Sequence, residues 1–139
     1  MDIHSSSVEE TRAAGAEAAH RSKPGDIWAL IGDLGCGKTE FVRGFTTALT
    51  TSILIRSPTF TILNIYDTPV FSIYHFDFYR LKSSKELFEI GFNEYLHGHG
   101  VCIIEWADMF PGVLPDYTRT IRFTDAGNNQ RMISLPDIY

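Results

Sequence analysis

Cysteine is scarce in this sequence, and long apolar runs are missing from it. Two cysteines, Cys36 and Cys102, occur among 139 residues, with neither the spacing of a metal site nor the number of a disulfide framework. No apolar run approaches the length of a membrane span, and no basic segment followed by an apolar stretch opens the chain. These absences predict a cytoplasmic protein without a disulfide scaffold, a thiolate metal site or a membrane segment.

Basic residues are also in the minority. The chain has 12 lysines and arginines against 17 acidic residues, which gives a net charge of −5. A broad basic surface for nucleic acid is therefore not expected, and any contact with RNA would be local or indirect. At 139 residues, with 44% of them hydrophobic, the chain has the composition of a soluble globular protein. Its length predicts one domain over residues 1–139.

Residues 32–39 read Gly-Asp-Leu-Gly-Cys-Gly-Lys-Thr and match G-x-x-x-x-G-K-[ST], the phosphate-binding P-loop. Glycines allow the positive φ angles that turn backbone N–H groups toward an anion. Lys38 adds a charge for the β- and γ-phosphates, and the Thr39 hydroxyl is a ligand for Mg²⁺. The residues expected to contact a nucleotide are Asp33, Leu34, Gly35, Cys36, Gly37, Lys38, Thr39 and Glu40.

The segments on either side of this loop favour a P-loop over a simple glycine turn with a surface lysine. Residues 26–31 are apolar enough for a buried strand, and residues 39–49 have the apolar spacing of a helix. That helix points its positive end at the same anion. Helices mixed with strands predict an α/β fold, specifically a P-loop NTPase-like three-layer sandwich. Its central sheet is expected to be mixed but mainly parallel, with helices on both faces.

The remaining elements follow from local patterns. Residues 8–21 are predicted to form an alanine-rich helix after a serine N-cap. Residues 83–96 are predicted to form a helix that Gly91 breaks or kinks. Strands are expected over residues 53–55, 60–66, 70–76, 101–105, 119–123 and 131–135. The strands at 60–66 and 70–76 should pair as a hairpin.

Two of the predicted strands end in an acid, and nucleotide hydrolysis needs a carboxylate near Mg²⁺. Asp77 follows residues 72–76, and Glu105 follows residues 101–104. Either acid could hold the metal, and Glu105 could instead orient the attacking water. The alternative for each is an acid that caps a nearby turn. Both are therefore catalytic and metal-binding candidates, with their division of labour left open.

Four further side chains are weaker candidates. Thr59 lies in the loop after the P-loop helix, where a threonine can reach Mg²⁺ and the γ-phosphate. Arg80 could contact phosphate or a partner, or form only a surface ion pair. His75 could ligate a metal with Asp77, although a packed or hydrogen-bonded histidine is the more common case. Trp106 could stack on a base, anchor an interface or pack in the core.

Two cysteine interpretations and one charge pattern complete the candidates. Cys102 is expected to pack in the core, whereas Cys36, at a helix N-terminus, could be an oxidisable thiol. Between Glu86 and Asp116 there are six acids and no lysine or arginine. Such a stretch is usually a solvated face, and it could also dock a basic partner.

Four motifs taken together resemble the bacterial TsaE (YjeE) family. They are the P-loop at 32–39, Ser-Pro-Thr-Phe-Thr at 57–61, His-Phe-Asp-Phe-Tyr-Arg-Leu at 75–81 and Ile-Glu-Trp at 104–106. The stretch from Glu86 to Leu96 and the Leu-Pro pair at 114–115 also look like that family. The resemblance covers nearly the whole chain. One departure is Cys36, which stands where the family often has alanine.

The resemblance implies a small ATPase that uses ATP and Mg²⁺ and assists a TsaD–TsaB protein complex. That complex places threonylcarbamoyl on an adenosine of the tRNA anticodon loop, and the ATPase activity depends on it. By the family pattern, Lys38 and Thr39 bind phosphate and Mg²⁺, and Thr59 is a switch threonine. Asp77 is an essential acid near the metal. Glu105 and Trp106 are further functional positions.

Two other functions fit parts of the sequence. A small nucleotide or metabolite kinase would need an acceptor pocket and usually an arginine-rich lid, which the sequence does not show. A nucleotide-gated binding module would dock on a partner without turnover. A GTPase is disfavoured, because neither Asp-x-x-Gly nor Asn-Lys-x-Asp occurs.

Overall fold

The computed structural model, which describes residues 1–33, 35 and 37–136, contains one mixed sheet of seven strands. Along the sheet, the strands lie in the order β1-β7-β6-β2-β5-β4-β3. Their bounds are β1 Asp2–Ser5, β2 Ile27–Ile31, β3 Leu63–Asp67, β4 Ser72–Asp77, β5 Val101–Glu105, β6 Arg119–Gly127 and β7 Gln130–Ser134. The four central strands β6, β2, β5 and β4 are parallel, and antiparallel pairs complete both edges.

The two middle strands are apolar along their length because both of their faces are covered. β2 and β5 pair in parallel, and almost every residue of the two is buried. A strand with one wet face would alternate polar and apolar residues instead. The buried pair carries the P-loop at the end of β2 and Glu105 at the end of β5. Both features therefore emerge at the same edge of the sheet.

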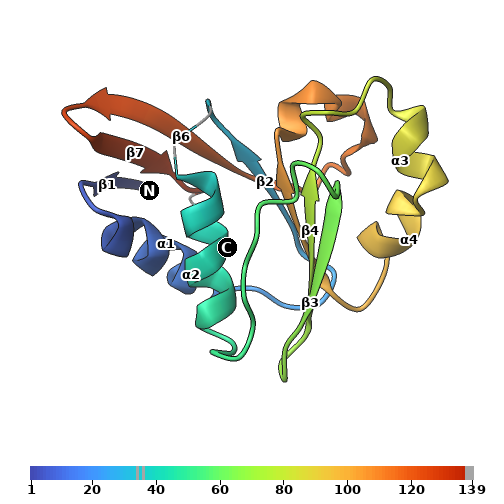
Figure 1. The fold of residues 1–139 in the computed structure, drawn as a ribbon, viewed down its shortest axis with the longest axis horizontal. Helices are drawn as coiled ribbons and strands as arrows, with labels where there is room; N and C mark the ends of the chain where they lie inside the picture. The colour runs from blue at the N-terminus through green and yellow to red at the C-terminus, as the bar shows by residue number, and fades with distance from the viewer. Residues whose placement is uncertain (34, 36, 137–139) are drawn as a thin grey trace.

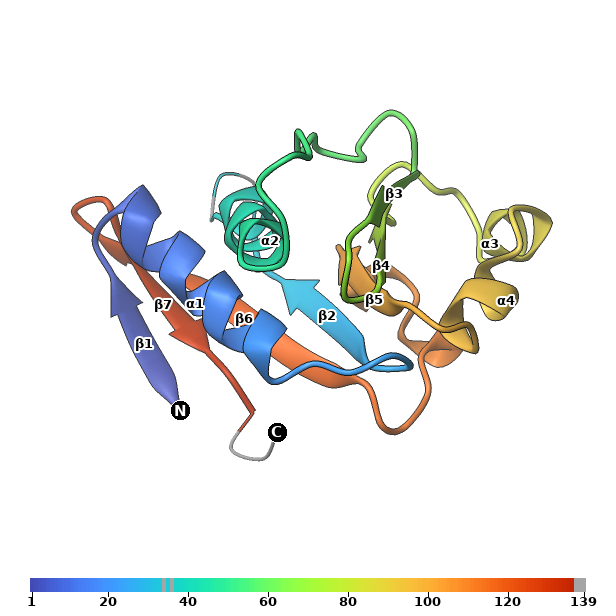
Figure 2. The same cartoon turned by 90° about the horizontal axis from the view of Figure 1, so that it is seen from below.

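Helices cover both faces of the sheet (Figures 1 and 2). The helices are α1 Val8–His20, α2 Lys38–Thr47, α3 Lys85–Glu89 and α4 Phe92–Leu96, with 3₁₀ turns η1 Ala107–Met109 and η2 Pro111–Val113. One core cluster joins α1 and α2 to the sheet, and a second joins α3 and α4 to the other face. The predicted three-layer α/β fold is confirmed. Among the described residues, no helix is both long and apolar enough to span a bilayer.

The backbones of α1 and α2 come unusually close, and two glycines make this possible. A Cβ atom on Gly15 would lie 2.0 Å from the carbonyl oxygen of Phe41. A Cβ atom on Gly44 would lie 1.9 Å from the carbonyl oxygen of Arg12. Only a residue without a side chain fits at either distance. The helix that follows the P-loop is therefore held directly against α1.

Local patterns predicted most elements but misplaced the segment before the central hairpin. Residues 53–55 were expected to be a strand, yet the chain from 53 to 57 is irregular. Residues 58–62 form turns, with Ile62 at a φ of 70°, so β3 begins only at Leu63. The prediction also missed β1. The helix break at Gly91 is confirmed, because its φ of 81° separates α3 from α4.

Candidate nucleotide-binding site

The P-loop connects the end of β2 to the first turn of α2, as predicted. Gly35 and Gly37 have φ angles of 75° and 98°, which side chains rarely adopt. Gly37 is also the N-cap of α2, and no side chain caps the helix there. The first N–H groups of α2 are thus left for another partner, as in an anion site. The expected contacts of Leu34 and Cys36 lie outside the described residues.

Lys38 lies beside the loop in a largely buried position. The side chain is only 5% exposed, and Nζ donates a hydrogen bond to the carbonyl oxygen of Gly32. The same Nζ lies 3.8 Å from the centroid of the Trp106 ring, a cation–π contact. The ammonium group is therefore held between a carbonyl and an aromatic face, at the mouth of the loop.

A cleft of about 260 Å³ brings the P-loop together with the predicted acids. The lining residues are Gly35, Gly37, Lys38, Thr39, Glu40, Ser57, Thr59, Asp77, Glu105 and Trp106. They come from the P-loop, the loop before β3, and the ends of β4 and β5. All the catalytic candidates predicted from the sequence thus share one cleft. The Glu40 carboxylate in addition accepts from Arg12 at 2.7 Å.

Asp77 and Glu105 are direct neighbours across the β4–β5 pair. The Asp77 side chain accepts a hydrogen bond from Thr59 Oγ1 at 3.0 Å and one from the Tyr79 backbone N–H at 2.8 Å. Burial raises the pKa of Asp77 above its ordinary value, and these two hydrogen bonds counteract part of that rise. Both of these hydrogen-bond donors are neutral groups, so neither brings a positive charge to the carboxylate.

Glu105 is held differently, by a histidine inside the protein. Glu105 Oε2 lies 2.6 Å from His75 Nε2, and the His75 ring is completely buried. His75 Nδ1 lies 3.2 Å from the Tyr66 hydroxyl. The hydrogen-bonded interpretation of His75 therefore applies. Sequence reasoning did not single out Tyr66, although its place opposite Ile73 in the hairpin puts it beside the strand that carries His75.

The remaining candidates lie at the rim. Trp106 has a left-handed φ of 57° and its ring packs on Tyr79, with centroids 4.7 Å apart. Arg80 is exposed and does not line the cleft, and its guanidinium lies 4.8 Å from the ring of Phe60. Phe60 itself is 84% exposed. This pair therefore belongs to the outer surface beside the cleft.

The cleft has the chemistry that a magnesium-bound polyphosphate needs. A buried carboxylate whose partners are neutral, next to a hydroxyl and a second carboxylate, suits a hard cation that prefers oxygen ligands. Within the described residues, no group of three histidine, cysteine or acidic side chains could hold a metal alone. The oxygen donors of Thr39, Asp77 and Glu105 therefore fit an ion that draws its other ligands from phosphate and water.

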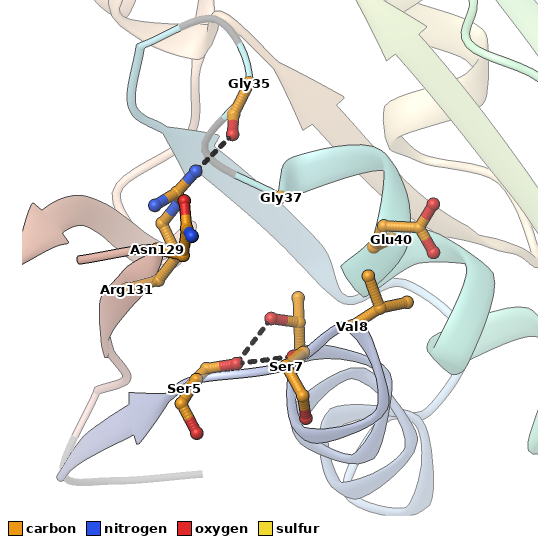
Figure 3. Close-up of a pocket in the computed structure, with 10 residues that line it drawn as sticks. Ser5, Ser7, Val8, Gly35, Gly37, Glu40, Asn129 and Arg131 are labelled. Carbon is orange, nitrogen blue, oxygen red and sulfur yellow. Dashed lines mark hydrogen bonds between the residues drawn. The ribbon is translucent and has the colours of Figure 1, made fainter. Parts of the chain in front are cut away.

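A second hollow of about 310 Å³ adjoins the P-loop on its other side (Figure 3). Its walls come from the start of α1, the P-loop and the β6–β7 hairpin. Arg131 donates from Nη2 to the carbonyl oxygen of Gly35 at 2.9 Å, and Ser5 Oγ lies 2.7 Å from Thr11 Oγ1. Asp33 is exposed and lines a neighbouring hollow that Arg131 shares.

Cys102 lies away from both hollows, in the core. Its thiol donates to the carbonyl oxygen of Tyr95 at 3.5 Å, and burial raises the pKa of Cys102 to about 12. A thiol that remains protonated is a poor nucleophile and a poor metal ligand. The core interpretation of Cys102 is confirmed.

Comparison with known proteins shows similarity along most of the chain. A model of the family described as "Threonylcarbamoyl adenosine biosynthesis protein TsaE" matches residues 5–133. A Bacillus subtilis protein named tRNA threonylcarbamoyladenosine biosynthesis protein TsaE is 42% identical over 127 residues, covering 91% of this chain and 79% of that protein. A Treponema pallidum protein of the same name is 37% identical over 135 residues, covering 97% and 99%.

A solved structure shares the fold. The crystal structure of Bacillus subtilis YdiB superposes with a TM-score of 0.81 at 36% sequence identity. The match covers 96% of this chain and 82% of that one.

Proposed function

This chain belongs to the TsaE family and so has a role in tRNA threonylcarbamoyladenosine biosynthesis, and on that premise we propose that it is an ATPase. In this proposal it binds Mg-ATP and hydrolyses it in complex with TsaD–TsaB. The hydrolysis supports threonylcarbamoyl modification of an adenosine in the tRNA anticodon loop. We also propose that the protein acts in the cytoplasm, which is consistent with a role in tRNA modification.

One observation carries the proposal. The P-loop lysine, the Thr39 hydroxyl and two strand-end acids line a single cleft. Phosphoryl transfer to water needs a cradle for phosphate, a metal site and a group that places the water. Binding alone would not require the acids, which are costly to bury. Their presence beside the loop favours turnover over a purely gated binding module.

Each residue has a role that its surroundings suit. Lys38 Nζ would exchange its hydrogen bond to the Gly32 carbonyl oxygen for hydrogen bonds to phosphate oxygens. Thr39 and Asp77 would hold Mg²⁺, which when bound neutralises charge on the phosphates. Glu105, lining the same cleft, would orient the attacking water and accept its proton. Thr59, bonded to Asp77, would close over the γ-phosphate as a switch threonine.

The nucleoside has a separate place in this proposal. The hollow between the start of α1 and the β6–β7 hairpin shares Gly35, Gly37 and Glu40 with the cleft (Figure 3). A nucleotide whose phosphates lie on the loop could therefore extend its ribose and base toward Arg131 and Asn129. The two hollows together give the molecule room for one nucleotide.

The partner is proposed to be the TsaD–TsaB complex, with tRNA contacted only indirectly or locally. The surface beside the cleft offers the exposed Phe60, Arg80 and Tyr79. Exposed aromatic and arginine side chains are common anchors of protein interfaces. The net charge of −5 makes an extended RNA surface less suitable.

Phosphate release from ATP, measured with and without a purified TsaD–TsaB complex, tests the proposal. We expect slow release alone and strong stimulation by the complex. Fast release that requires a small-molecule acceptor, without the complex, would instead establish a kinase. ATP-dependent docking without any phosphate release would establish a gated binding module.

A further inference from the structure

A chain of hydrogen bonds runs through the protein from the loop before β3 to Glu105. The carbonyl oxygen of Arg56 accepts from the Tyr66 hydroxyl at 2.9 Å. That hydroxyl lies 3.2 Å from His75 Nδ1, and His75 Nε2 lies 2.6 Å from Glu105 Oε2. Tyr66, His75 and Glu105 are all buried. The chain thus crosses three strands, from β3 through β4 to β5.

The direction of these bonds can be assigned from the number of hydrogens available. A phenol has one hydrogen, and the Arg56 carbonyl, the nearer partner, can only accept it. The Tyr66 oxygen must then accept from His75, so that Nδ1 carries a hydrogen. His75 Nε2 is left to face Glu105. The phenol therefore fixes which edge of the imidazole meets the carboxylate.

The same loop reaches the other acid by a shorter route. Ser57 Oγ lies 2.8 Å from Thr59 Oγ1, which donates to Asp77 Oδ2. Residues 56–59 are thereby connected to both acids of the cleft, directly to Asp77 and through two buried rings to Glu105. Glu105 Oε2 is hydrogen-bonded to the imidazole of His75, so Oε1 is the oxygen left to make contacts in the cleft.

We propose that His75 is a positioning residue, which holds Glu105 through Oε2 so that Oε1 faces the cleft, and that Tyr66 fastens the imidazole to the loop at Arg56. The inference rests on the proposed ATPase function and deepens it. His75 and Tyr66 touch neither nucleotide nor water in this account. Their effect reaches the reaction only through the direction of the Glu105 carboxylate.

Packing alone does not explain the arrangement. A completely buried imidazole between two polar partners is costly unless each hydrogen bond is made, and an apolar residue would fill the same space. Groups that orient functional carboxylates and ligands from behind are a recurring feature of such sites, and their loss typically costs 10- to 100-fold in activity. The geometry here matches that role, because the imidazole contacts the carboxylate from inside the sheet.

Two substitutions of His75 separate positioning from packing. The amide of His75→Gln can reach the place of Nε2 and donate a hydrogen bond to the Glu105 carboxylate. The amide of His75→Asn reaches only the place of Nδ1, toward Tyr66. With TsaD–TsaB present, we expect His75→Asn to lower kcat by about 10- to 100-fold. We expect His75→Gln to keep kcat within about threefold of the parent, with the ATP affinity of both variants nearly unchanged.

Tyr66→Phe gives an independent test, with Tyr74→Phe as its matched control. Tyr74 lies beside His75 in β4, but it packs on the opposite face against Tyr95. We expect Tyr66→Phe to lower kcat by less than His75→Asn, and Tyr74→Phe to leave it unchanged. Equal activity of His75→Gln and His75→Asn, or a loss confined to ATP affinity, would overturn the proposal.

A spectroscopic measurement tests the same contacts without any turnover. In ¹⁵N-histidine-labelled protein, we expect an exchange-protected, downfield imidazole N–H signal that disappears in His75→Gln. Tyr66→Phe and Glu105→Gln should each shift it, and Tyr74→Phe should not. Absence of such a signal would overturn the assignment. Failure of the complex to stimulate the parent protein would instead contradict the ATPase proposal, while this signal would still report on the hydrogen-bond chain.

Discussion

The two walls of the cleft are built in opposite ways. The P-loop wall comes from one continuous stretch, residues 32–39, which contains Lys38 and the two glycines with positive φ, Gly35 and Gly37. The acid wall is assembled from the ends of β4 and β5 and from the loop before β3. Its two acids are held by hydrogen bonds to side chains and to one backbone N–H. One wall is thus local in sequence, and the other depends on how distant segments pack.

The acid wall also contains a contrast of its own. Asp77 accepts from a hydroxyl and a backbone N–H, whereas Glu105 meets a buried imidazole. The two acids are neighbours in register, but the hydrogen-bond partner of Glu105 is an ionisable side chain, whereas the two described donors to Asp77 are not. This difference suits the roles proposed for them. Asp77 remains available to a metal ion, and Glu105 has a fixed orientation.

Removing the one cation of the P-loop wall should have the largest effect. We expect Lys38→Ala to abolish ATP binding, with affinity lowered by at least about 100-fold, because a charge-assisted contact to phosphate is lost. Isothermal titration calorimetry with ATP measures this, with the exposed Lys23→Ala as control. Parent-like affinity in Lys38→Ala would contradict the P-loop assignment.

Removing an acid should leave binding intact and stop hydrolysis. We expect Asp77→Ala to bind ATP within a few-fold of the parent but to lose stimulated turnover by about 100- to 1,000-fold, as when an electrostatic contact to the reacting group is lost. Calorimetry and phosphate release, performed on the same preparation, separate the two effects. If stimulated turnover were unchanged, Asp77 would have no part in metal binding.

The buried Asp77 charge should also affect folding stability in a direction set by pH. Because burial raises its pKa above 3.8, ionisation costs more in the folded than in the unfolded protein. This contribution is fully favourable below the unfolded pKa and is lost as pH rises through the folded pKa. We therefore expect Asp77→Asn to raise Tm at pH 7 relative to the parent.

The gain in Tm should shrink as the pH falls below about 4, where the unfolded aspartate is itself protonated. Thermal melts across this range measure it, with the exposed Asp108→Asn as the matched control. A gain in Tm of the same size at acidic and neutral pH would show that ionisation is not its source.

The smallest expected effect lies at the outer side of the P-loop wall. Arg131→Ala removes one hydrogen bond to the Gly35 carbonyl. We expect ATP affinity to fall two- to fivefold, roughly 0.5–1 kcal/mol for a partly exposed bond. Arg122→Ala, on the exposed face of the neighbouring strand, is the control. A loss comparable to that of Lys38→Ala would mean that Arg131 contacts phosphate directly.

The contrast between the walls also explains what the sequence could predict. Local sequence patterns suffice to predict three features: the P-loop, the broken helix at Gly91 and the acid at the end of β5. In each case glycine positions or apolar spacing among neighbouring residues are informative. The bond between His75 and Glu105 depends on the β4–β5 register, which no local pattern specifies. Asp77 and Glu105 were each expected near the P-loop because each follows an apolar strand, and the β4–β5 pairing brings the two acids side by side.

The missed elements have the same cause. β1 is only four residues long and has little periodicity, so its place beside β7 comes from tertiary contact. The apolar residues 53–55 resemble a strand, but they lie in an irregular segment. In that segment the carbonyl oxygen of Arg56 accepts a hydrogen bond from the Tyr66 hydroxyl. In both cases, partners far along the chain decide the local structure.

The pairing of β1 with β7 sets an order for assembly during synthesis. Asp2 lies opposite Ser134, so the first and last strands of the described chain pair with each other. During synthesis, the strands β2 to β6 are all made before β7, the strand with which β1 pairs. The contact of α1 with α2, where Gly15 and Gly44 let the two backbones meet, does not depend on β7. Closing the sheet at its β1 edge therefore requires residues at both ends of the described chain, whereas packing α1 on α2 requires only its first third.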